Sequence, residues 1–376
     1  MKLGLLVAVK YMIKCSMCER DSNGLLDFRC DYCGKPFDIQ VLPDFDKKRI
    51  HRKDYSLWRY REFFPYTKEM DTITLGEGCT PLVQFSSKVH FKLESLNPTG
   101  SFKDRGSAVL ISAVQKRIKS ERGFISEDSS GNAGASIAAY AARAGLKAKI
   151  YVPETVSGPK FNQIQLYGAQ VAKIPGSRNK VAEEAQKHEP GKFYVGHILH
   201  PLFRDGIRSL AYEIAEQLDW KVPDSIYLPV SAGTLLLGAI AGFKHLFDSD
   251  VIESIPRIVA CQTSQVSPLY HRFKNLDYTP PEKITSVADA LVSIDPPLLD
   301  LMVKKLKEVN GDSVMVEERE VVEAYKNLAR KGFFVEPSSA VAYAGYTKHT
   351  TSGEASQSTK AVTVLTGMGL KTTFRP

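Results

Sequence analysis

Short apolar strands and helical segments alternate along most of this chain, and this pattern limits its fold more than any other feature. Beta-branched runs at residues 124–127, 148–153 and 225–230 are each followed by a helical pattern. Strands that alternate with helices pair in parallel, and the helices cover both faces of the sheet. The sequence therefore predicts an α/β fold with open, mostly parallel sheets, and 376 residues suffice for two domains.

Composition and charge exclude several classes of protein. Hydrophobic residues make up 43% of the chain and charged residues 24%, which is typical of a folded protein and excludes a mostly disordered one. No apolar run approaches the ~20 residues of a membrane-spanning helix. The net charge of +8 slightly favours anionic partners, but no dense Lys/Arg run suggests a nucleic-acid-binding arm. We expect no membrane partner.

Four of the six cysteines form two closely spaced pairs near the N-terminus, Cys15-x2-Cys18 and Cys30-x2-Cys33. Two such pairs on a hairpin supply four thiolates in a tetrahedron, which suits zinc. Because four thiolates leave no open coordination position, a metal here would be structural. The alternative is four unligated thiols. We predict a zinc-ribbon-like knuckle over residues 1–45.

The first residues, MKLGLLVAVKYM, have some features of a short signal peptide. The apolar stretch is at the minimum length and no cleavage site follows it. A strand leading into the cysteines, or a true start at Met12, explains the segment better. We therefore expect a cytoplasmic protein, in which paired thiols bind metal more often than they form disulfides.

The domain plan follows from the same scan along the chain. A charged stretch after residue 43 has little apolar periodicity, and we interpret it as a linker. We predict the linker and the start of a large domain over residues 46–96. A small domain would follow over residues 97–190, and residues 191–376 would complete the large domain.

Lys103 is a candidate catalytic residue. It follows a Pro-Gly turn and precedes a helical pattern that begins near Asp104. The positive potential at a helix N-terminus lowers the pKa of an amine and raises its nucleophilicity, which suits Schiff-base chemistry. Taken alone, it is equally a surface lysine at the start of a helix.

Asn132 lies in a loop of small residues between a strand and an Ala-rich helix. Small side chains allow a ligand or another backbone to approach closely, and the amide of Asn132 offers both a donor and an acceptor. The alternative is a tight turn with a capping role. The residues before it in this loop are Ser129, Ser130 and Gly131.

Two further segments follow strands. Backbone N–H groups and the helix dipole after the strand at 225–230 would form an anion site, although the segment matches no common phosphate-binding sequence. Thr366 ends the last strand. The carboxyl edge of a parallel sheet faces the crevice where ligands bind, so this threonine is a candidate binding residue. The alternative is a strand that simply ends in a Gly turn. The anion-site residues are Ser231, Ala232, Gly233, Thr234 and Leu235.

Taken together and in order, these motifs resemble those of the tryptophan-synthase-β-like enzymes that use pyridoxal 5′-phosphate (PLP), which have fold type II. Within that family the chain is most similar to threonine synthase. The supporting sequences are GEGCTPL at 76–82, NPTGSFKDRG at 97–106, GFFVEPSSA at 332–340 and LTGMGLK at 365–371. A cysteine knuckle ahead of the enzyme also occurs in relatives of threonine synthase.

The resemblance implies roles for the candidate residues. Lys103 would form the Schiff base with PLP and later remove the Cα proton, and Asn132 would bind the ring hydroxyl. Residues 231–235 would hold the phosphate by backbone N–H groups. Thr366 would face the pyridine nitrogen, which favours elimination or replacement over transamination. Substrate would be bound by Ser101, Ser129, Ser130 and Gly131. Relatives are mostly dimers, so we expect a homodimer.

The chain departs from threonine synthases where those enzymes bind substrate phosphate with asparagine and arginine. Here His197 and His200 replace the asparagines, and Arg204 is displaced by one position. The two histidines could meet an anionic substrate or hold a metal, but two loop histidines without a ligand are the simpler interpretation. Recognition of O-phosphohomoserine is therefore an open question.

Three functions follow from these observations. The first is a PLP-dependent lyase of the threonine synthase type, acting on an amino acid with a leaving group that may be phosphorylated. The second is a serine or threonine ammonia-lyase, because the loop SSGNAG at 129–134 is closer to those enzymes. The third is a metal-knuckle protein with a degenerate enzyme domain, which could bind nucleic acid through the basic stretch 47–53.

Overall fold

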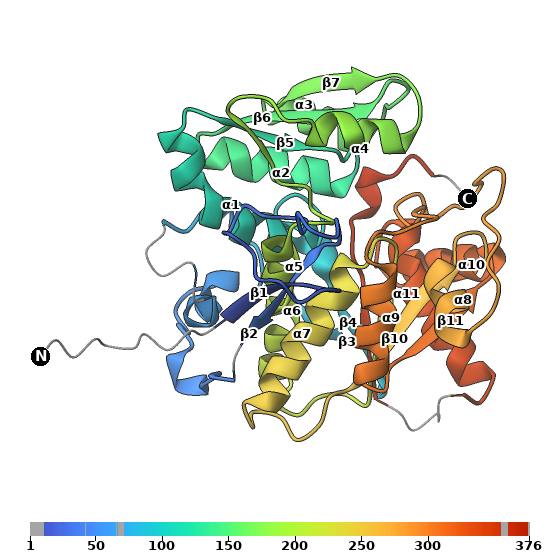
Figure 1. Ribbon diagram of the computed structural model, residues 1–376. Coiled ribbons are helices and arrows are strands. Elements are labelled where there is room, and N and C mark those ends of the chain that lie inside the picture. The colour runs from blue at the N-terminus through green and yellow to red at the C-terminus, as the bar shows by residue number, and fades with distance from the viewer. Residues whose placement is uncertain (1–10, 42, 65, 67–70, 355–359, 375–376) are drawn as a thin grey trace, which may run out of the picture.

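The computed structural model describes residues 11–41, 43–64, 66, 71–354 and 360–374. These residues form two mostly parallel sheets flanked by helices, together with a small antiparallel hairpin (Figure 1). The expected α/β class with mostly parallel sheets is confirmed. Residues 1–10, considered above as a signal peptide, lie outside the described residues. No helix in the described ranges is both long and apolar enough to cross a membrane.

The smaller sheet has four parallel strands in the order β7-β6-β5-β8 (green in Figure 1). Its central strands are largely buried, so their apolar runs follow from cover on both faces. The strands are β5 (Phe124–Glu127), β6 (Lys147–Pro153), β7 (Gln170–Ile174) and β8 (Lys192–Tyr194). The helices between them are α2 (Asn132–Arg143), α3 (Pro159–Leu166) and α4 (Arg178–Gln186).

The larger sheet has six strands in the order β11-β10-β9-β12-β4-β3, and only the edge strand β3 is antiparallel to its neighbour. Every residue of β9 and β12 is buried, as expected at the centre of a covered sheet. The strands are β3 (Leu82–Gln84), β4 (Val89–Lys92), β9 (Ser225–Pro229), β10 (Arg257–Thr263), β11 (Asp312–Val316) and β12 (Ala361–Val364).

Helices surround and join the two sheets. The longest, α1 (Lys103–Ser120), packs against α2 of the small sheet and against α5. The remaining α-helices are α5 (Pro201–Ile207), α6 (Ser209–Gln217), α7 (Thr234–Asp248), α8 (Pro268–Lys274), α9 (Leu299–Glu308), α10 (Glu318–Arg330) and α11 (Pro337–Thr351). Short 3-10 turns are η1 (Lys47–Arg49), η2 (Leu57–Phe63), η4 (Glu94–Leu96) and η5 (Gly369–Lys371). The domain limits proposed above remain a prediction. The last strand of the small sheet, β8, lies at residues 192–194, just beyond the predicted limit of 190.

The N-terminal hairpin consists of β1 (Tyr11–Cys15) and β2 (Phe37–Val41), and β1 leads into the first cysteine. Most of the segment 1–12, where a strand was expected, lies outside the described residues. It lies against α5 (dark blue in Figure 1). The Phe28 ring packs edge-on against Tyr194 at 4.7 Å, and the Arg204 guanidinium donates to the carbonyl of Phe37. Lys305 pairs with Asp38 at 3.5 Å. The hairpin is therefore docked on both the small sheet and the body of the large one.

The stretch expected to be a solvated linker is instead part of the core. Leu57, Trp58, Tyr60 and Phe63 in η2 are at most 1% exposed and join the main hydrophobic cluster. The charged residues between these large side chains hid the apolar positions, because a 3-10 turn gives no period-3.6 pattern. The linker prediction was wrong for this segment.

Candidate active site

A cavity of about 270 Å³ opens where strands of both sheets end. Its walls come from residues 129–133 after β5, residues 197–198 after β8, residues 229–236 after β9, and Thr366 after β12. Ligands of open parallel sheets bind beyond the carboxyl ends of the strands, so this is the expected place for a site. Lys103 also lines the cavity.

Lys103 is the first residue of α1, as the sequence predicted to within one residue. Its Nζ lies 3.1 Å from the hydroxyl of Thr234 and 4.6 Å from the centre of the Phe102 ring. Burial lowers the pKa of Lys103 to about 8, while the nearby Glu127 raises it in part. Burial, rather than the helix terminus invoked above, is the main cause. A reactive free amine is thus accessible near neutral pH.

Asn132 is the first residue of α2 and lines the cavity. Its Nδ2 donates to Glu336 at 2.7 Å, while its Oδ1 is buried with no hydrogen-bond partner among the described residues. Glu336 also pairs with Lys160 at 2.6 Å. A Cβ on Gly367 would lie 1.7 Å from Glu336 Oε1, so this position requires glycine. The sequence motif around Glu336 was recognised, but no role was assigned to it.

The N-terminus of α7 forms the floor of the cavity. Gly233 adopts φ 95°, a left-handed conformation, and α7 begins without a side-chain cap. Its first N–H groups are thus available to an anion. A Cβ on Gly233 would come within 2.3 Å of the Met302 sulfur, so both the backbone and the space require glycine. The predicted anion site at residues 231–235 lines the cavity.

The other predicted residues are placed as follows. Thr366 is buried, and its hydroxyl lies 2.9 Å from that of Ser339. Ser129, Ser130 and Gly131 line the cavity. Ser101 does not, although its hydroxyl is buried without a partner among the described residues.

A buried pair that the sequence analysis missed stands at the end of the small sheet. The Nδ1 of His197 lies 2.7 Å from Glu127 Oε1, and the backbone N–H of His197 donates to Glu127 Oε2 at 3.0 Å. The sequence did contain a signal for this pair, because β5 ends in a glutamate at the edge of the sheet where ligands bind. His200 does not line the cavity, because its Nδ1 accepts from Leu202 N at the start of α5. Arg204 binds the backbone carbonyls of residues 198 and 199 and has no place in the cavity wall.

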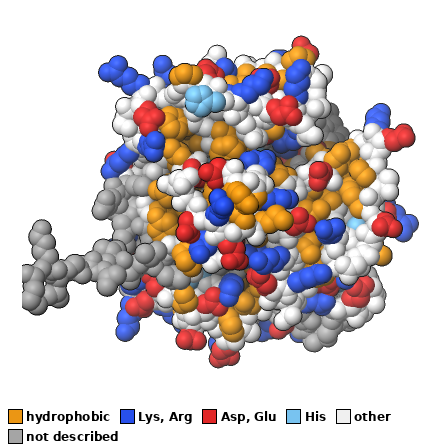
Figure 2. All heavy atoms as spheres, viewed as in Figure 1, with side chains coloured by type: hydrophobic (Ala, Val, Ile, Leu, Met, Phe, Trp, Pro, Cys, Tyr) orange, Lys and Arg blue, Asp and Glu red, His pale blue; other side chains and the backbone are white. Residues whose placement is uncertain are grey.

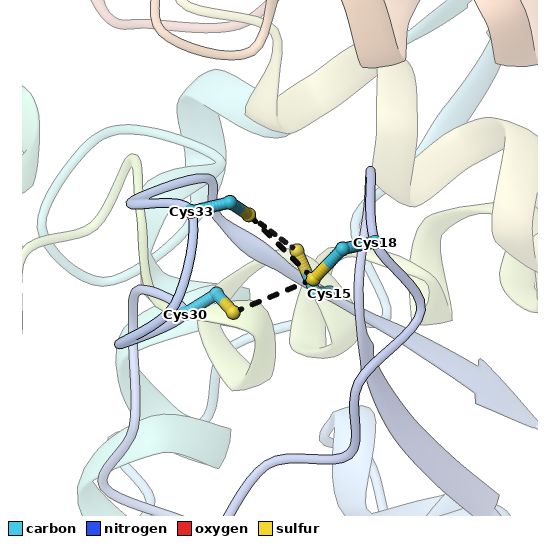
Figure 3. A group of neighbouring side chains, drawn as sticks. All are labelled: Cys15, Cys18, Cys30 and Cys33. Atoms are coloured by element: carbon cyan, nitrogen blue, oxygen red, sulfur yellow. Dashed lines mark hydrogen bonds between the residues drawn. The ribbon is translucent and has the colours of Figure 1, made fainter.

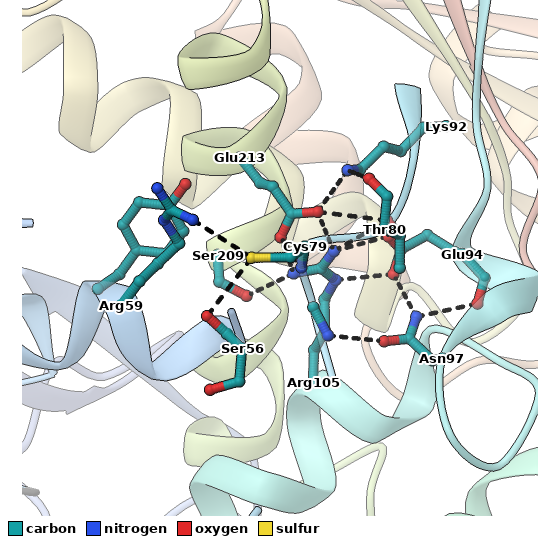
Figure 4. A network of polar contacts seen from close by, with 12 residues as sticks. Ser56, Arg59, Cys79, Thr80, Lys92, Glu94, Asn97, Arg105, Ser209 and Glu213 are labelled. Atoms are coloured by element: carbon teal, nitrogen blue, oxygen red, sulfur yellow. Dashed lines mark hydrogen bonds and ion pairs between the residues drawn. The ribbon is translucent and has the colours of Figure 1, made fainter. Parts of the chain in front are cut away.

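A buried ion cluster fixes α1 just beyond Lys103 (Figure 4). Arg105 donates to both oxygens of Glu94 at 2.7 Å and to those of Glu213 at 3.0 and 3.1 Å. Lys92 donates to Glu213 as well. These contacts tie η4 and α6 to α1, so they hold the helix whose first residue is the cavity lysine.

The four clustered cysteines meet at one point of the N-terminal hairpin (Figure 3). All four sulfurs lie within 4.8 Å of one another, with contacts of 3.4 and 3.6 Å, and none forms a disulfide. A tetrahedral zinc with bonds of about 2.3 Å has sulfur–sulfur edges of about 3.8 Å. The donor set and its spacing therefore fit a structural zinc ion. In a search of the described residues for three or more metal-binding side chains close enough to hold a metal, these four cysteines are the group found.

Comparison with known proteins identifies the family. The profile described as "Pyridoxal-phosphate dependent enzyme" matches residues 73–367. The chain belongs to this family. It is 30% identical over 376 aligned residues to the threonine synthase of Methanocaldococcus jannaschii, covering 91% of this chain and 92% of that protein. It is 32% identical over 333 residues to the threonine synthase of Halalkalibacterium halodurans, covering 84% and 90%.

Two solved structures share the fold. Maize serine racemase superposes with a TM-score of 0.65 at 24% identity, over 77% of this chain and 88% of that one. A threonine deaminase from Solanum lycopersicum gives a TM-score of 0.65 at 18% identity, over 88% and 87%. The cavity fits the cofactor of the family, because it combines a lysine of lowered pKa, an uncapped helix N-terminus and an amide oxygen that lacks a partner.

Proposed function

We propose that this protein is a PLP-dependent lyase of the threonine synthase type. It would act by elimination and replacement on an amino acid with a leaving group, such as O-phospho-L-homoserine. One observation carries the proposal: the Nζ of Lys103 lies in a cavity that also contains the N-terminus of α7, Asn132 and Thr366. Relatives named threonine synthase match almost the whole chain, which supports this reaction over others of the family.

The residues of this chain would divide the work as follows. Lys103 would bind PLP covalently, Asn132 its ring hydroxyl, residues 231–235 its phosphate, and Thr366 its ring nitrogen. When bound, PLP supplies an electron sink beside Cα. The amine of Lys103 then removes the Cα proton, for which its lowered pKa suits it. Because a neutral hydroxyl at Thr366 leaves the ring nitrogen largely unprotonated, elimination is favoured over transamination.

Arg178 supports a phosphorylated substrate. It is the first residue of α4 and lines the cavity. Among the described residues of the cavity wall, Lys103 and Arg178 carry the basic side chains. Arg178→Ala should raise the KM for O-phosphohomoserine by about tenfold or more, because a charge-assisted hydrogen bond is worth about 1.5–3 kcal/mol. Lys180→Ala is the matched control, because Lys180 is exposed on the same helix but does not line the cavity. An equal effect of both variants would contradict this role.

A serine or threonine ammonia-lyase is the second candidate. The Ser129–Ser130–Gly131 loop favours it, and the fold of a threonine deaminase is similar. The third candidate, a nucleic-acid-binding protein, gains no support from the viewed surface. Figure 2 shows basic and acidic side chains interspersed on that face rather than gathered in one basic patch.

We also propose one structural zinc per chain at Cys15, Cys18, Cys30 and Cys33, a homodimer, and a cytoplasmic location. The sulfur spacing supports the zinc, and the resemblance to dimeric relatives supports the dimer.

The deciding experiment offers PLP-loaded protein four substrates: O-phosphohomoserine, O-phosphoserine, threonine and serine. The assay measures phosphate, threonine and 2-oxo acid. Phosphate and threonine from O-phosphohomoserine support a synthase, whereas 2-oxo acid from threonine or serine without phosphate release selects the ammonia-lyase. Lys103→Ala should lose both the cofactor absorbance band and turnover; retention of both would refute the proposal.

A further inference from the structure

The Glu127–His197 pair connects the small sheet to the cavity. Ser126 of β5 pairs in register with Tyr194 of β8, and the backbone N–H of Val195, just after β8, donates to the carbonyl of Ser126. This places the last residue of β5, Glu127, against His197 in the segment after β8. The Glu127 side chain is fully buried and that of His197 is 7% exposed. The pair is thus built into the fold.

The histidine ring presents one edge to the carboxyl group and lines the cavity. Its Nδ1 is engaged by Glu127, so Nε2 is the ring nitrogen left to meet a ligand. The ring of Phe203 lies 5.7 Å from the His197 ring and 5.7 Å from the Nζ of Lys103. The imidazole and the cavity amine therefore both lie near Phe203, and both line the cavity.

The charges around the pair come from several elements. The amine of Lys103 on α1 and the guanidinium of Arg178 on α4 both act on the titration of His197 and Glu127. The neighbouring carboxyl of Asp128 accepts from the hydroxyl of Tyr194 at 2.8 Å. Burial raises the pKa of Glu127 to about 8 and lowers that of His197 well below its ordinary value. Since the two groups are hydrogen-bonded, a proton can pass between the cavity side and Glu127.

We propose that His197, positioned by Glu127, is the acid–base residue for the oxygen on the β carbon of the substrate. This rests on the proposed function. Threonine formation adds water across the Cα=Cβ bond of the unsaturated substrate that remains after phosphate has left. The water oxygen forms a bond to Cβ, one water O–H bond breaks, and its proton moves to Nε2 of His197. The electron pair of the double bond moves to Cα, where the ammonium of Lys103 returns a proton.

In a dehydration, which is the reverse of water addition, His197 would act as the acid. When a β-hydroxyl leaves from threonine or serine, the C–O bond breaks and Nε2 gives its proton to the departing oxygen, while Lys103 takes the Cα proton. Hydroxide is a poor leaving group without this proton, whereas phosphate leaves without one. His197 therefore matters for the β-oxygen step and not for phosphate release.

The test compares three variants of the full-length, PLP-loaded protein. His197→Gln removes the basic ring, and Glu127→Gln keeps the size of the positioning side chain but removes its titratable carboxyl group. Asp128→Asn is the matched control, because it makes the same acid-to-amide change in the adjacent buried residue, which binds Tyr194 instead. With O-phosphohomoserine, the assay follows phosphate, threonine and 2-oxobutanoate. A second readout is the pH at which the ring 15N resonances of His197 shift.

In His197→Gln, phosphate release should stay within about threefold, while threonine per phosphate falls by ~100-fold or more, in the range of a lost acid–base group. The stranded unsaturated product should hydrolyse to 2-oxobutanoate. Glu127→Gln should lower the same ratio and move the 15N transition, whereas Asp128→Asn should leave the ratio unchanged. The proposal is overturned if threonine and phosphate fall in proportion, if the ratio is unchanged, or if Glu127→Gln leaves the 15N transition in place.

Failure of the proposed function is a separate result. If the unaltered protein releases no phosphate but dehydrates threonine, the synthase assignment fails, and His197→Gln should then retain deuterium exchange at Cα of threonine while losing 2-oxobutanoate. Equal loss of both reactions would overturn the role of His197. If the unaltered protein acts on none of the four amino acids, both proposals are wrong.

Discussion

Replacing Arg105 by methionine measures what the buried ion cluster contributes to stability. The side chains of Arg105 and Glu94 are fully buried, and that of Glu213 is 3% exposed. Without the guanidinium, the carboxylate of Glu94 loses its cation and Glu213 keeps only Lys92. Breaking a buried ion pair by removing one partner costs about 3–5 kcal/mol. We expect the free energy of unfolding at neutral pH to fall by about this amount.

The titration of Glu213 gives a second route to the magnitude. Burial alone would raise its pKa, but Arg105 and Lys92 hold it at about 2, below the ordinary value of 4.5. At about 1.4 kcal/mol for each pKa unit, this carboxylate contributes about 3 kcal/mol. Because its pKa is depressed in the folded state, the contribution is complete above pH 4.5 and is lost as the pH falls toward 2.

Urea unfolding followed by circular dichroism at pH 7 and pH 4 tests this reasoning. In Arg105→Met the carboxyl groups take up protons more readily, so the difference from the unaltered protein should shrink at pH 4. Arg117→Met is the matched control, because Arg117 forms an exposed i,i+4 pair with Glu121 on the same helix and should change stability by about 0.5 kcal/mol or less. A difference below about 1 kcal/mol at pH 7, or one that is constant with pH, would refute the argument.

Three further predictions concern the cavity and the knuckle. Gly233→Ala should raise the Kd for PLP by about tenfold or more, because a Cβ there lies 2.3 Å from the Met302 sulfur; an absorbance titration measures this. Gly145→Ala, with similar backbone but open space, should bind PLP normally. Covalent attachment of PLP to the apoprotein should accelerate as the pH rises through about 8, because burial lowers the pKa of Lys103 and only the free amine attacks; a midpoint near 10.5 would contradict this. Elemental analysis should find zinc in the unaltered protein but not in Cys30→Ser, which should also have a lower Tm; equal metal content would contradict the zinc site.

The sequence predicted those parts of the fold and site in which neighbours along the chain carry the signal. The strand before Asn132 and the helix after it could be recognised because an apolar run, small loop residues and an alanine-rich helix follow one another. Lys103 and Gly233 could be placed at helix starts for the same reason.

Features that depend on tertiary packing could not be predicted in this way. The segment around Trp58 was misread because its apolar side chains have no helical or strand period. The Glu127–His197 pair joins residues 70 positions apart, and neither residue has a local pattern that names the other. The cause of the lowered pKa of Lys103 was also missed, because burial depends on elements that are distant in sequence.

The docking of the N-terminal hairpin has a consequence for the order in which the chain folds. The contacts within the hairpin are local, so its four sulfurs can assemble during synthesis once Val41 has left the ribosome. Its partners come much later, since Arg204 lies 167 positions after Phe37 and Lys305 later still. Chains are made from the N-terminus and fold in that order where they can. Among the described elements, the knuckle is therefore able to form before the body against which it packs.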